Sequence, residues 1–307
     1  MEHWFIPYQA AELPPARQVL VLAPHPDDEV FGCGGAAALL QQRGAAVTVL
    51  VLTDGAGLAP EAERAAITRT RQSETNAALA VLGLPPAKFW GLPDRSLAHA
   101  APPAQRIEAV LQGVDLVFAP SLTEIHPDHA ATGQALLSAL QSRMAQGAPL
   151  PDVLLYEVGT PLVPNFLLDI SAVWPAKQAA MRCFASQQTH QDYARHVAGL
   201  NAFRTYTLDA AVQYAEAYHL IPAAQLPARL AQSAFPTRMG VRDAYQAEGL
   251  LRAAEASAAR LQAQLAAQQH SSALAELAQA HRDVLNSRSW RWTRPLRWLA
   301  ERLSRRP

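Results

Sequence analysis

Four short apolar runs restrict the folds open to this chain. Each run is continuous and rich in Val and Leu, which is typical of strands that are buried on both faces of a parallel sheet. The runs lie at residues 18–24, 46–53, 115–120 and 152–158. Helical stretches rich in Ala and Leu separate them, at about 33–43, 61–82, 104–112 and 129–146. The alternation predicts an α/β fold, a Rossmann-like three-layer sandwich with a mostly parallel sheet.

The loop after the first run has the composition of a metal site. Residues 24–29 read PHPDDE, and in sheets of this kind ligands bind beyond the carboxyl ends of the strands. His25 and Asp28 are three positions apart, so one turn aims both at a single ion, and both ligand types suit Zn²⁺. Asp27 projects differently, which leaves it free to act on water at the metal. The alternative is that the acidic residues only complement the dipole at the N-terminus of a helix, and that His25 has no functional role.

A second cluster follows the run at 115–120. Residues 123–129 read TEIHPDH, in which His126 and His129 are again three apart and Pro127 suits the first turn of a helix. Alone, an HxxH pair is as consistent with a structural role as with a functional one. Combined with His25 and Asp28, one of these histidines completes three ligands, which is the open, catalytic type of zinc site.

The strings PHPDDE and HPDH, in this order, resemble the PIG-L/LmbE-like N-acetylglucosaminyl deacetylases. The likeness runs over most of residues 16–220. Its weaker parts are TDG at 53–55, RQSE at 71–74, GLPD at 91–94, Lys177, Ser186 with Gln187, and AEAY at 215–218. The resemblance implies zinc as the cofactor, bound by His25, Asp28 and His129.

The resemblance also implies roles for further residues. Asp27 would be the general base, and His126 would stabilise the developing oxyanion or protonate the leaving amine, with Asp128 orienting or tuning that histidine. The positions of Arg71 and Asp94 match family positions that contact the sugar or its attached group. The chain departs from the family just after these, where Arg95 stands in place of a frequent glycine.

The activity implied is zinc-dependent hydrolysis of the N-acetyl amide of a nucleotide-, lipid- or glycan-linked N-acetylated sugar. The chemistry of the residues agrees, because zinc lowers the pKa of water from 15.7 towards about 7 and a neighbouring carboxylate completes deprotonation. The alternative is a non-catalytic binding or scaffolding protein with a vestigial metal site. A decayed site would have lost one of its histidines or aspartates, and all are present. The sequence leaves open which sugar is used and whether another divalent metal replaces zinc.

A nucleotide cofactor is the other alternative. The string GCGGAA at 32–37 fits a loose dinucleotide fingerprint, and Asp54 ends the next apolar run. That fingerprint needs its first glycine directly after the strand, whereas residues 25–31 intervene. The glycines therefore indicate close packing of helix against sheet, and Asp54 reads as an ordinary turn residue of TDG.

Composition limits the compartment and the partners. Two cysteines cannot form a disulfide framework, and neither a secretory signal nor an apolar run long enough to span a bilayer is visible, which predicts a cytoplasmic protein. Residues 286–307 carry a net charge of +6, which leaves −6 on residues 1–285. An acidic body argues against nucleic acid as a partner.

Beyond residue 225 the strand and helix alternation stops. We expect three regions: a deacetylase domain at 1–225, a helical segment at 226–285 and a basic tail at 286–307. Residues 241–285 lack proline and place Leu and Ala at three- and four-residue spacing, which predicts an amphipathic helix or coiled coil and a homo-oligomer. The alternative is a helix folded back on the catalytic domain.

The tail places three tryptophans among seven arginines. This composition is typical of a segment that lies on anionic lipid, so we expect peripheral contact with the inner face of the membrane. The tail also resembles those of bacterial glycosyltransferases and related enzymes of surface-polysaccharide assembly, which favours a role in that biosynthesis. The alternatives are a disordered tail and a patch for a protein partner.

Overall fold

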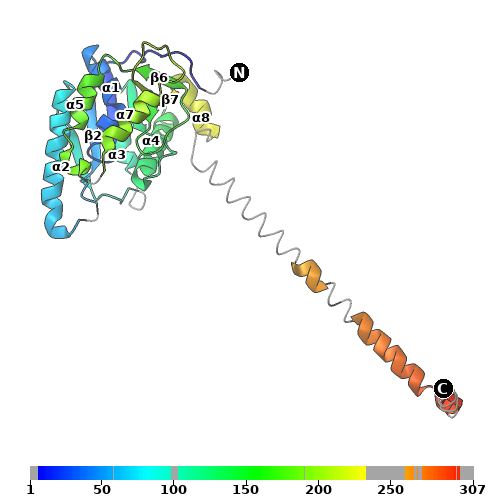
Figure 1. The fold of residues 1–307 in the computed structure, drawn as a ribbon. Helices are drawn as coiled ribbons and strands as arrows, with labels where there is room; N and C mark the ends of the chain where they lie inside the picture. The colour runs from blue at the N-terminus through cyan, green and yellow to red at the C-terminus, as the bar shows by residue number, and fades with distance from the viewer. Residues whose placement is uncertain are drawn as a thin grey trace. The chain divides into compact units, whose positions relative to one another are not determined.

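The computed structural model describes residues 6–57, 59–97, 103–189, 191–232, 260–265, 268, 272–294 and 296–297. The chain divides into two compact units, residues 1–240 and 241–307 (Figure 1).

The first unit is built on a seven-stranded sheet in the order β3-β2-β1-β4-β5-β7-β6. The strands are β1 Gln18–Ala23, β2 Ala46–Thr53, β3 Lys88–Leu92, β4 Leu116–Pro120, β5 Asp152–Tyr156, β6 Phe166–Asp169 and β7 Ala215–Ile221. The pairs from β3 to β5 are parallel, and β7 is antiparallel to both of its neighbours. The predicted α/β fold with a mostly parallel sheet is confirmed.

Helices cover both faces of the sheet. They are α1 Asp28–Gln42, α2 Glu61–Val81, α3 Ala104–Val110, α4 Pro127–Ala145, α5 Trp174–Met181, α6 Ala185–Gln188, α7 Tyr193–Phe203 and α8 Leu226–Gln232, the last preceded by the 3₁₀ turn η2 Ala223–Gln225. One buried cluster joins the sheet to α1, α2, α5 and α7, and a second joins its other face to α3, α4 and α8 (Figure 1). These two cores give the three layers that the apolar runs predict.

The strand order fixes where a site can form. It reverses between β1 and β4, since β2 lies on one side of β1 and β4 on the other. Loops that leave the carboxyl ends of these two strands therefore diverge and leave a crevice between them. Both predicted metal motifs follow these strands, at the start of α1 and of α4.

The compact body extends beyond the expected boundary at residue 225. Leu226 and Leu230 of α8 are buried in the cluster that includes α4. Two apolar residues four apart on one helix face explain this packing, because they form a single stripe against the body. The first residues of the expected helical segment thus belong to the first unit.

The described residues of the second unit are helical except for Ser287 and Thr293, which flank α10. Residues 260–265 and 272–286 are helical, and α10 spans Arg288–Trp292. The upstream part of the predicted coiled coil, residues 241–259, and the end of the basic tail, residues 298–307, lie outside the described residues. Among the residues that the structure describes, no helix has both the length and the apolar character needed to cross a membrane.

Candidate metal centre

The turn from β1 into α1 carries the first motif in a strained conformation. Asp27 precedes the first helical residue and has φ 127, a region that non-glycine residues rarely adopt. The backbone N–H of His25 donates to the carboxylate of Asp28 over 2.9 Å, which closes the turn. The motif therefore presents its histidine and both aspartates from one tight bend at the carboxyl end of β1.

Arg71 of α2 stabilises this bend through hydrogen bonds. Its guanidinium donates to the carbonyl oxygens of Gly55 and Pro26, each over 2.6 Å, and to the Asp27 carboxylate over 2.8 Å. Gly55 has φ 64, and a Cβ there would lie 2.8 Å from the guanidinium, so only glycine fits. Arg71 is buried beneath the loops after β1 and β2. The contact with substrate that the family resemblance implies for it stays a prediction.

Glu29 supports the same bend and was given no role by the sequence analysis. Its carboxylate accepts the backbone N–H of Asp27 over 3.0 Å. Burial raises the pKa of Glu29 to about 8, and the negative charge of Asp27 adds to this effect. Its position as the last acid of PHPDDE is the signal that could have pointed to it.

The second motif begins α4. His126 is the N-cap, and its Nδ1 accepts the backbone N–H of Asp128 over 3.2 Å. Pro127 occupies the first turn, as predicted. His129 lies one turn further along and is buried beside the first motif. Because Nδ1 accepts a hydrogen bond, the proton of neutral His126 sits on Nε2.

Three atoms of the predicted ligand set lie at nearly equal distances from one another. Nδ1 of His25 is 3.1 Å from Oδ2 of Asp28 and 3.2 Å from Nε2 of His129. Nε2 of His129 is 3.1 Å from the same oxygen of Asp28. Two imidazole nitrogens and a carboxylate oxygen thus form a compact triangle at the carboxyl ends of β1 and β4.

The triangle fits Zn²⁺. Tetrahedral zinc binds nitrogen and oxygen at about 2.0–2.2 Å, which places its ligand atoms about 3.3 Å apart. The observed edges are within a few tenths of that value, and the donor types are those of catalytic zinc sites. His126 also lies close, with one ring nitrogen within 4.8 Å of nitrogens of His25 and His129.

Carboxylates lie close to the outer nitrogens of both predicted histidine ligands. Nε2 of His25 is 3.2 Å from Asp94 and 3.3 Å from Asp128, and Nδ1 of His129 is 3.3 Å from Glu124. Such contacts orient a metal-binding imidazole and increase its basicity. Glu124 was not singled out by the sequence analysis, although it lies in TEIHPDH. The excess of negative charge favours a cation in the triangle.

Asp128 links the metal motif to the loop after β3. Its carboxylate accepts the backbone N–H groups of Arg95 over 2.6 Å and of Leu97 over 3.0 Å, besides its approach to His25. Its contact with His126 is made by the backbone N–H. The structure therefore brings the Asp128 side chain to His25 rather than to the histidine that the sequence analysis assigned to it.

The loop after β3 contains the departure from the family pattern. Arg95 has φ 66, the left-handed conformation that glycine adopts without strain. The neighbouring Asp94 accepts the backbone N–H of Gly57 over 2.9 Å with one oxygen and approaches His25 with the other. Asp94 thus ties two loops to the metal motif, and its predicted contact with the sugar stays a prediction.

Two side chains beside the triangle have pKa values suited to proton transfer and hydrogen bonding. Burial raises the pKa of Asp27 to about 6, although the Arg71 guanidinium opposes this shift. Burial also lowers the pKa of His126 below its usual 6.5, which favours the neutral ring with its proton on Nε2. A base that titrates near neutral pH is effective in catalysis.

Comparison with known proteins gives a match over both motifs. The family model described as GlcNAc-PI de-N-acetylase (PIG-L) matches residues 20–140. The match begins in β1 and ends in α4, and it therefore includes the whole ligand triangle.

Curated relatives match most of their own length. A probable N-acetyl-alpha-D-glucosaminyl L-malate deacetylase 2 from Bacillus cereus is 30% identical over 185 residues, which cover 56% of this chain and 84% of the relative. A 4-oxalmesaconate hydratase from Pseudomonas putida is 28% identical over 228 residues, which cover 66% of this chain and 88% of the relative.

A solved structure shares the fold. The N,N'-diacetylchitobiose deacetylase from Pyrococcus horikoshii aligns with a TM-score of 0.58 and 24% identity, over 68% of this chain and 85% of that chain.

Proposed function

Since this chain belongs to the PIG-L family of de-N-acetylases, we propose that it uses Zn²⁺ to hydrolyse the N-acetyl group of an N-acetylglucosamine-like sugar. The chain is a hydrolase of a linear amide C–N bond. The Bacillus cereus relative, whose name specifies an acetylated glucosaminyl group, supports the sugar assignment. The reaction consumes water and releases acetate and the free amine.

One observation carries the proposal. The two histidines and the aspartate of the triangle come from two motifs far apart in the chain, yet their ligand atoms lie within 3.2 Å of one another. A single cation between these three atoms would bind all of them at once, since their spacing is close to that of the ligand atoms of tetrahedral zinc. His25, Asp28 and His129 would hold the ion. A bound Zn²⁺ supplies a Lewis acid and lowers the pKa of water towards about 7.

The neighbouring residues supply the remaining chemistry. Asp27 takes the proton from the attacking water, because its carboxylate is buried and its pKa of about 6 lies near neutrality. His126 donates its Nε2 proton in a hydrogen bond to the oxygen that becomes negative as the tetrahedral centre forms. Arg71 fixes Asp27 through the ion pair of 2.8 Å, so that the base need not reorganise during the reaction.

The proposal is tested by a screen for acetate release. Purified full-length protein, stripped of metal and reloaded with Zn²⁺, is incubated with nucleotide-linked, lipid-linked and free N-acetylhexosamines. We expect release of acetate from at least one N-acetylglucosamine derivative. The Asp27→Asn variant, loaded with the same metal, is the matched control.

The 4-oxalmesaconate hydratase relative indicates which result would contradict the proposed function. An active site that activates water can also add it to a carbon–carbon double bond, so 4-oxalmesaconate, the compound in the name of that relative, belongs in the same screen. Hydration of that compound by the zinc-loaded protein, with no acetate from any N-acetylated sugar, would overturn the proposed function.

The basic tail supports a membrane-proximal substrate, of the kind used in cell-surface polysaccharide biosynthesis. Trp292 and Leu296 are exposed, and the Arg297 guanidinium lies 3.5 Å over the ring of Trp290. Exposed aromatic rings beside arginines suit the headgroup region of an anionic bilayer. Peripheral binding at the inner face of the membrane would bring the enzyme to a lipid-linked sugar.

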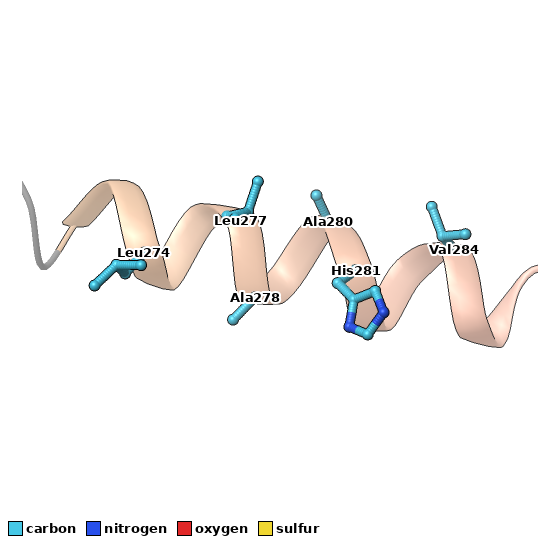
Figure 2. Close-up of a pocket in the computed structure, with 6 residues that line it drawn as sticks. All are labelled: Leu274, Leu277, Ala278, Ala280, His281 and Val284. Atoms are coloured by element: carbon cyan, nitrogen blue, oxygen red, sulfur yellow. The ribbon is translucent and has the colours of Figure 1, made fainter.

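The helix at 272–286 supports self-association. Figure 2 shows Leu274, Leu277, His281 and Val284, which recur at three- and four-residue spacing along it. Leu277 is 70% exposed within the described residues, which leaves an apolar stripe for a partner. A second copy of the same helix would cover this stripe in a coiled-coil manner. Sedimentation equilibrium of the full chain and of its double variant Leu277→Glu/Val284→Glu tests self-association through this stripe. We expect a lower mass for the variant, and an equal mass for both would contradict the proposed self-association.

A further inference from the structure

Helix α1, which carries the metal motif at its start, is broken in the middle. Cys33 has φ −143 and ψ 20, so residues 28–32 and 34–42 form two helical segments. A break of this kind leaves carbonyl groups without partners at the end of the first segment and N–H groups without partners at the start of the second. The break lies in the core, where each such group costs free energy if it stays unpaired.

Lys177 and Glu216 satisfy the two sides of the break. The Lys177 ammonium, from α5, donates to the carbonyl oxygen of Phe31 over 3.0 Å. The Glu216 carboxylate, from β7, accepts the backbone N–H groups of Gly35 and Ala36, each over 2.8 Å. The positive side chain thus caps the C-terminal end of one segment and the negative side chain caps the N-terminal end of the next, as the helix dipole favours.

The pair is fully buried and fully bonded. Lys177 is 0% exposed and Glu216 is 1% exposed, and their charged groups lie 2.6 Å apart. The amide oxygen of Asn201 accepts a further Lys177 N–H over 3.1 Å, and the Tyr218 hydroxyl donates to Glu216 over 2.5 Å. Three donors and four acceptor sites are therefore all used, which is the condition for a buried ion pair to fix one geometry.

Close packing explains why the break lies at this position. A Cβ on Gly32 would lie 2.3 Å from the ring of Tyr156, and one on Gly35 would lie 2.7 Å from Ile170. Gly32 thus lets the first segment approach β5 closely, and Gly35 lets the second segment approach Ile170. The ion pair then sets the angle between the segments.

We propose that Lys177 and Glu216 are positioning residues for the reaction, and that they act on Asp27 and Asp28 by fixing the orientation of the segment 28–32. This inference rests on the proposed function. The first segment is little more than one turn long, and Asp28 is its first residue. A small rotation of so short a segment moves Asp28 relative to His25 and His129, and moves Asp27 relative to the water that it deprotonates.

The test separates positioning from stability. Removing one partner leaves a buried charge unpaired and destabilises the fold, whereas removing both charges together is often tolerated. The double variant Lys177→Met/Glu216→Gln is therefore compared with Ile107→Ala. Ile107 is buried in α3 on the opposite face of the sheet, so its substitution lowers stability without contacting α1. Thermal unfolding of both variants shows whether they lose a similar amount of stability.

Two readouts are measured on each variant. The first is the dissociation constant for Zn²⁺, obtained by competition with a chelator, and the second is the pair kcat and KM on the substrate found for wild type. We expect the double variant to bind Zn²⁺ about tenfold or more weakly, as for other groups that support metal ligands. At saturating zinc we also expect kcat to fall at least about tenfold with KM almost unchanged. Ile107→Ala should match wild type in both.

A double variant with wild-type zinc affinity and kcat would overturn the proposal, as would an equal loss in Ile107→Ala. If the double variant does not fold, Tyr218→Phe carries the test. It removes one hydrogen bond to Glu216 and keeps the buried ring, and weaker zinc binding is again expected, with unchanged binding contradicting the proposal. Zinc binding is measured without substrate, so failure of the proposed reaction would leave the first readout intact.

Discussion

At the scale of single residues, Asp27 has the least favourable backbone conformation near the triangle. A non-glycine residue in such a region costs about 1–3 kcal/mol, and it persists only where the surroundings impose it. Arg71 and Glu29 impose it here. Arg71 donates to the Asp27 carboxylate and to the carbonyl oxygen of Pro26, and Glu29 accepts the backbone N–H of Asp27. Strain of this kind is consistent with a base held in place in advance of the reaction.

Replacing Asp27 by Asn tests its role as a base. Asn keeps the shape of the side chain but cannot take a proton, so kcat should fall by about 10²-fold or more while zinc content stays that of wild type. His126→Ala should act likewise by removing a donor to the oxyanion. Zinc analysis and steady-state kinetics check both, and loss of metal from Asp27→Asn would show that the two aspartates have exchanged roles.

Replacing His129 by Ala tests the ligand set. Removal of one of three protein ligands should abolish stoichiometric zinc binding and activity, since the remaining His25 and Asp28 cannot hold the ion alone. His129 lies near the start of α4, where Ala suits the helix, so the circular dichroism spectrum should be unchanged. Elemental analysis that finds full zinc occupancy in this variant would refute the assignment.

The candidate site could be predicted from sequence only in part. The triangle residues could be found because their motifs follow predicted strands and contain ligand types at a spacing of one turn. Glu124 and the Asp128 contact with His25 could not be found, because the folding of loops from different strands brings these groups together. Spacing along the chain carries no information on such contacts.

At the scale of elements, the strands that were predicted are the ones buried on both faces. The runs at 18–24, 46–53, 115–120 and 152–158 correspond to β1, β2, β4 and β5. The others lack that pattern: β3 is a half-exposed edge strand, β6 has four residues, and β7 contains the buried Glu216. Helix α1 begins at Asp28 rather than near residue 33, because the charged motif forms its first turn.

The glycines of α1 give a prediction at this scale. Gly32→Ala should lower the free energy of unfolding by about 2 kcal/mol or more, because the new Cβ would lie 2.3 Å from the fully buried ring of Tyr156. Gly34→Ala is the matched control. Its nearest neighbours would lie at 3.4 Å, an ordinary contact, so stability should stay within about 1 kcal/mol of wild type.

Urea unfolding of the two variants beside wild type checks this prediction. Equal midpoints for Gly32→Ala and Gly34→Ala would mean that close approach of α1 to β5 does not constrain residue 32. Both variants replace Gly by Ala, so the intrinsic difference in conformational preference between the two residue types is similar in each.

At the scale of the whole molecule, charge is divided between the basic tail and the rest of the chain. Residues 286–307 have a net charge of +6 and the rest of the chain −6, so an anionic surface attracts the tail and repels the body. The triangle lies in the first unit, and nothing in its chemistry needs the tail. We therefore expect that catalysis and the proposed membrane binding can be separated.

Truncation after Leu285 tests this separation. We expect unchanged kcat on a small N-acetylglucosamine derivative and lost sedimentation with vesicles that contain anionic lipid. Binding of the full chain should weaken as salt rises, because screening shortens the reach of the arginines. The full-length double variant Trp290→Ala/Trp292→Ala separates aromatic burial from charge. Equal sedimentation of truncated and full-length protein would favour a protein partner for the tail.

The central claim is that one zinc ion in the triangle of His25, Asp28 and His129 supports hydrolysis of an N-acetyl amide. The most direct measurement is acetate release by metal-free full-length protein during titration with Zn²⁺. We predict that the rate rises with added metal and saturates at about one ion per chain, and that Asp28→Ala shows no rise. Undiminished acetate release by the metal-free protein would contradict the claim.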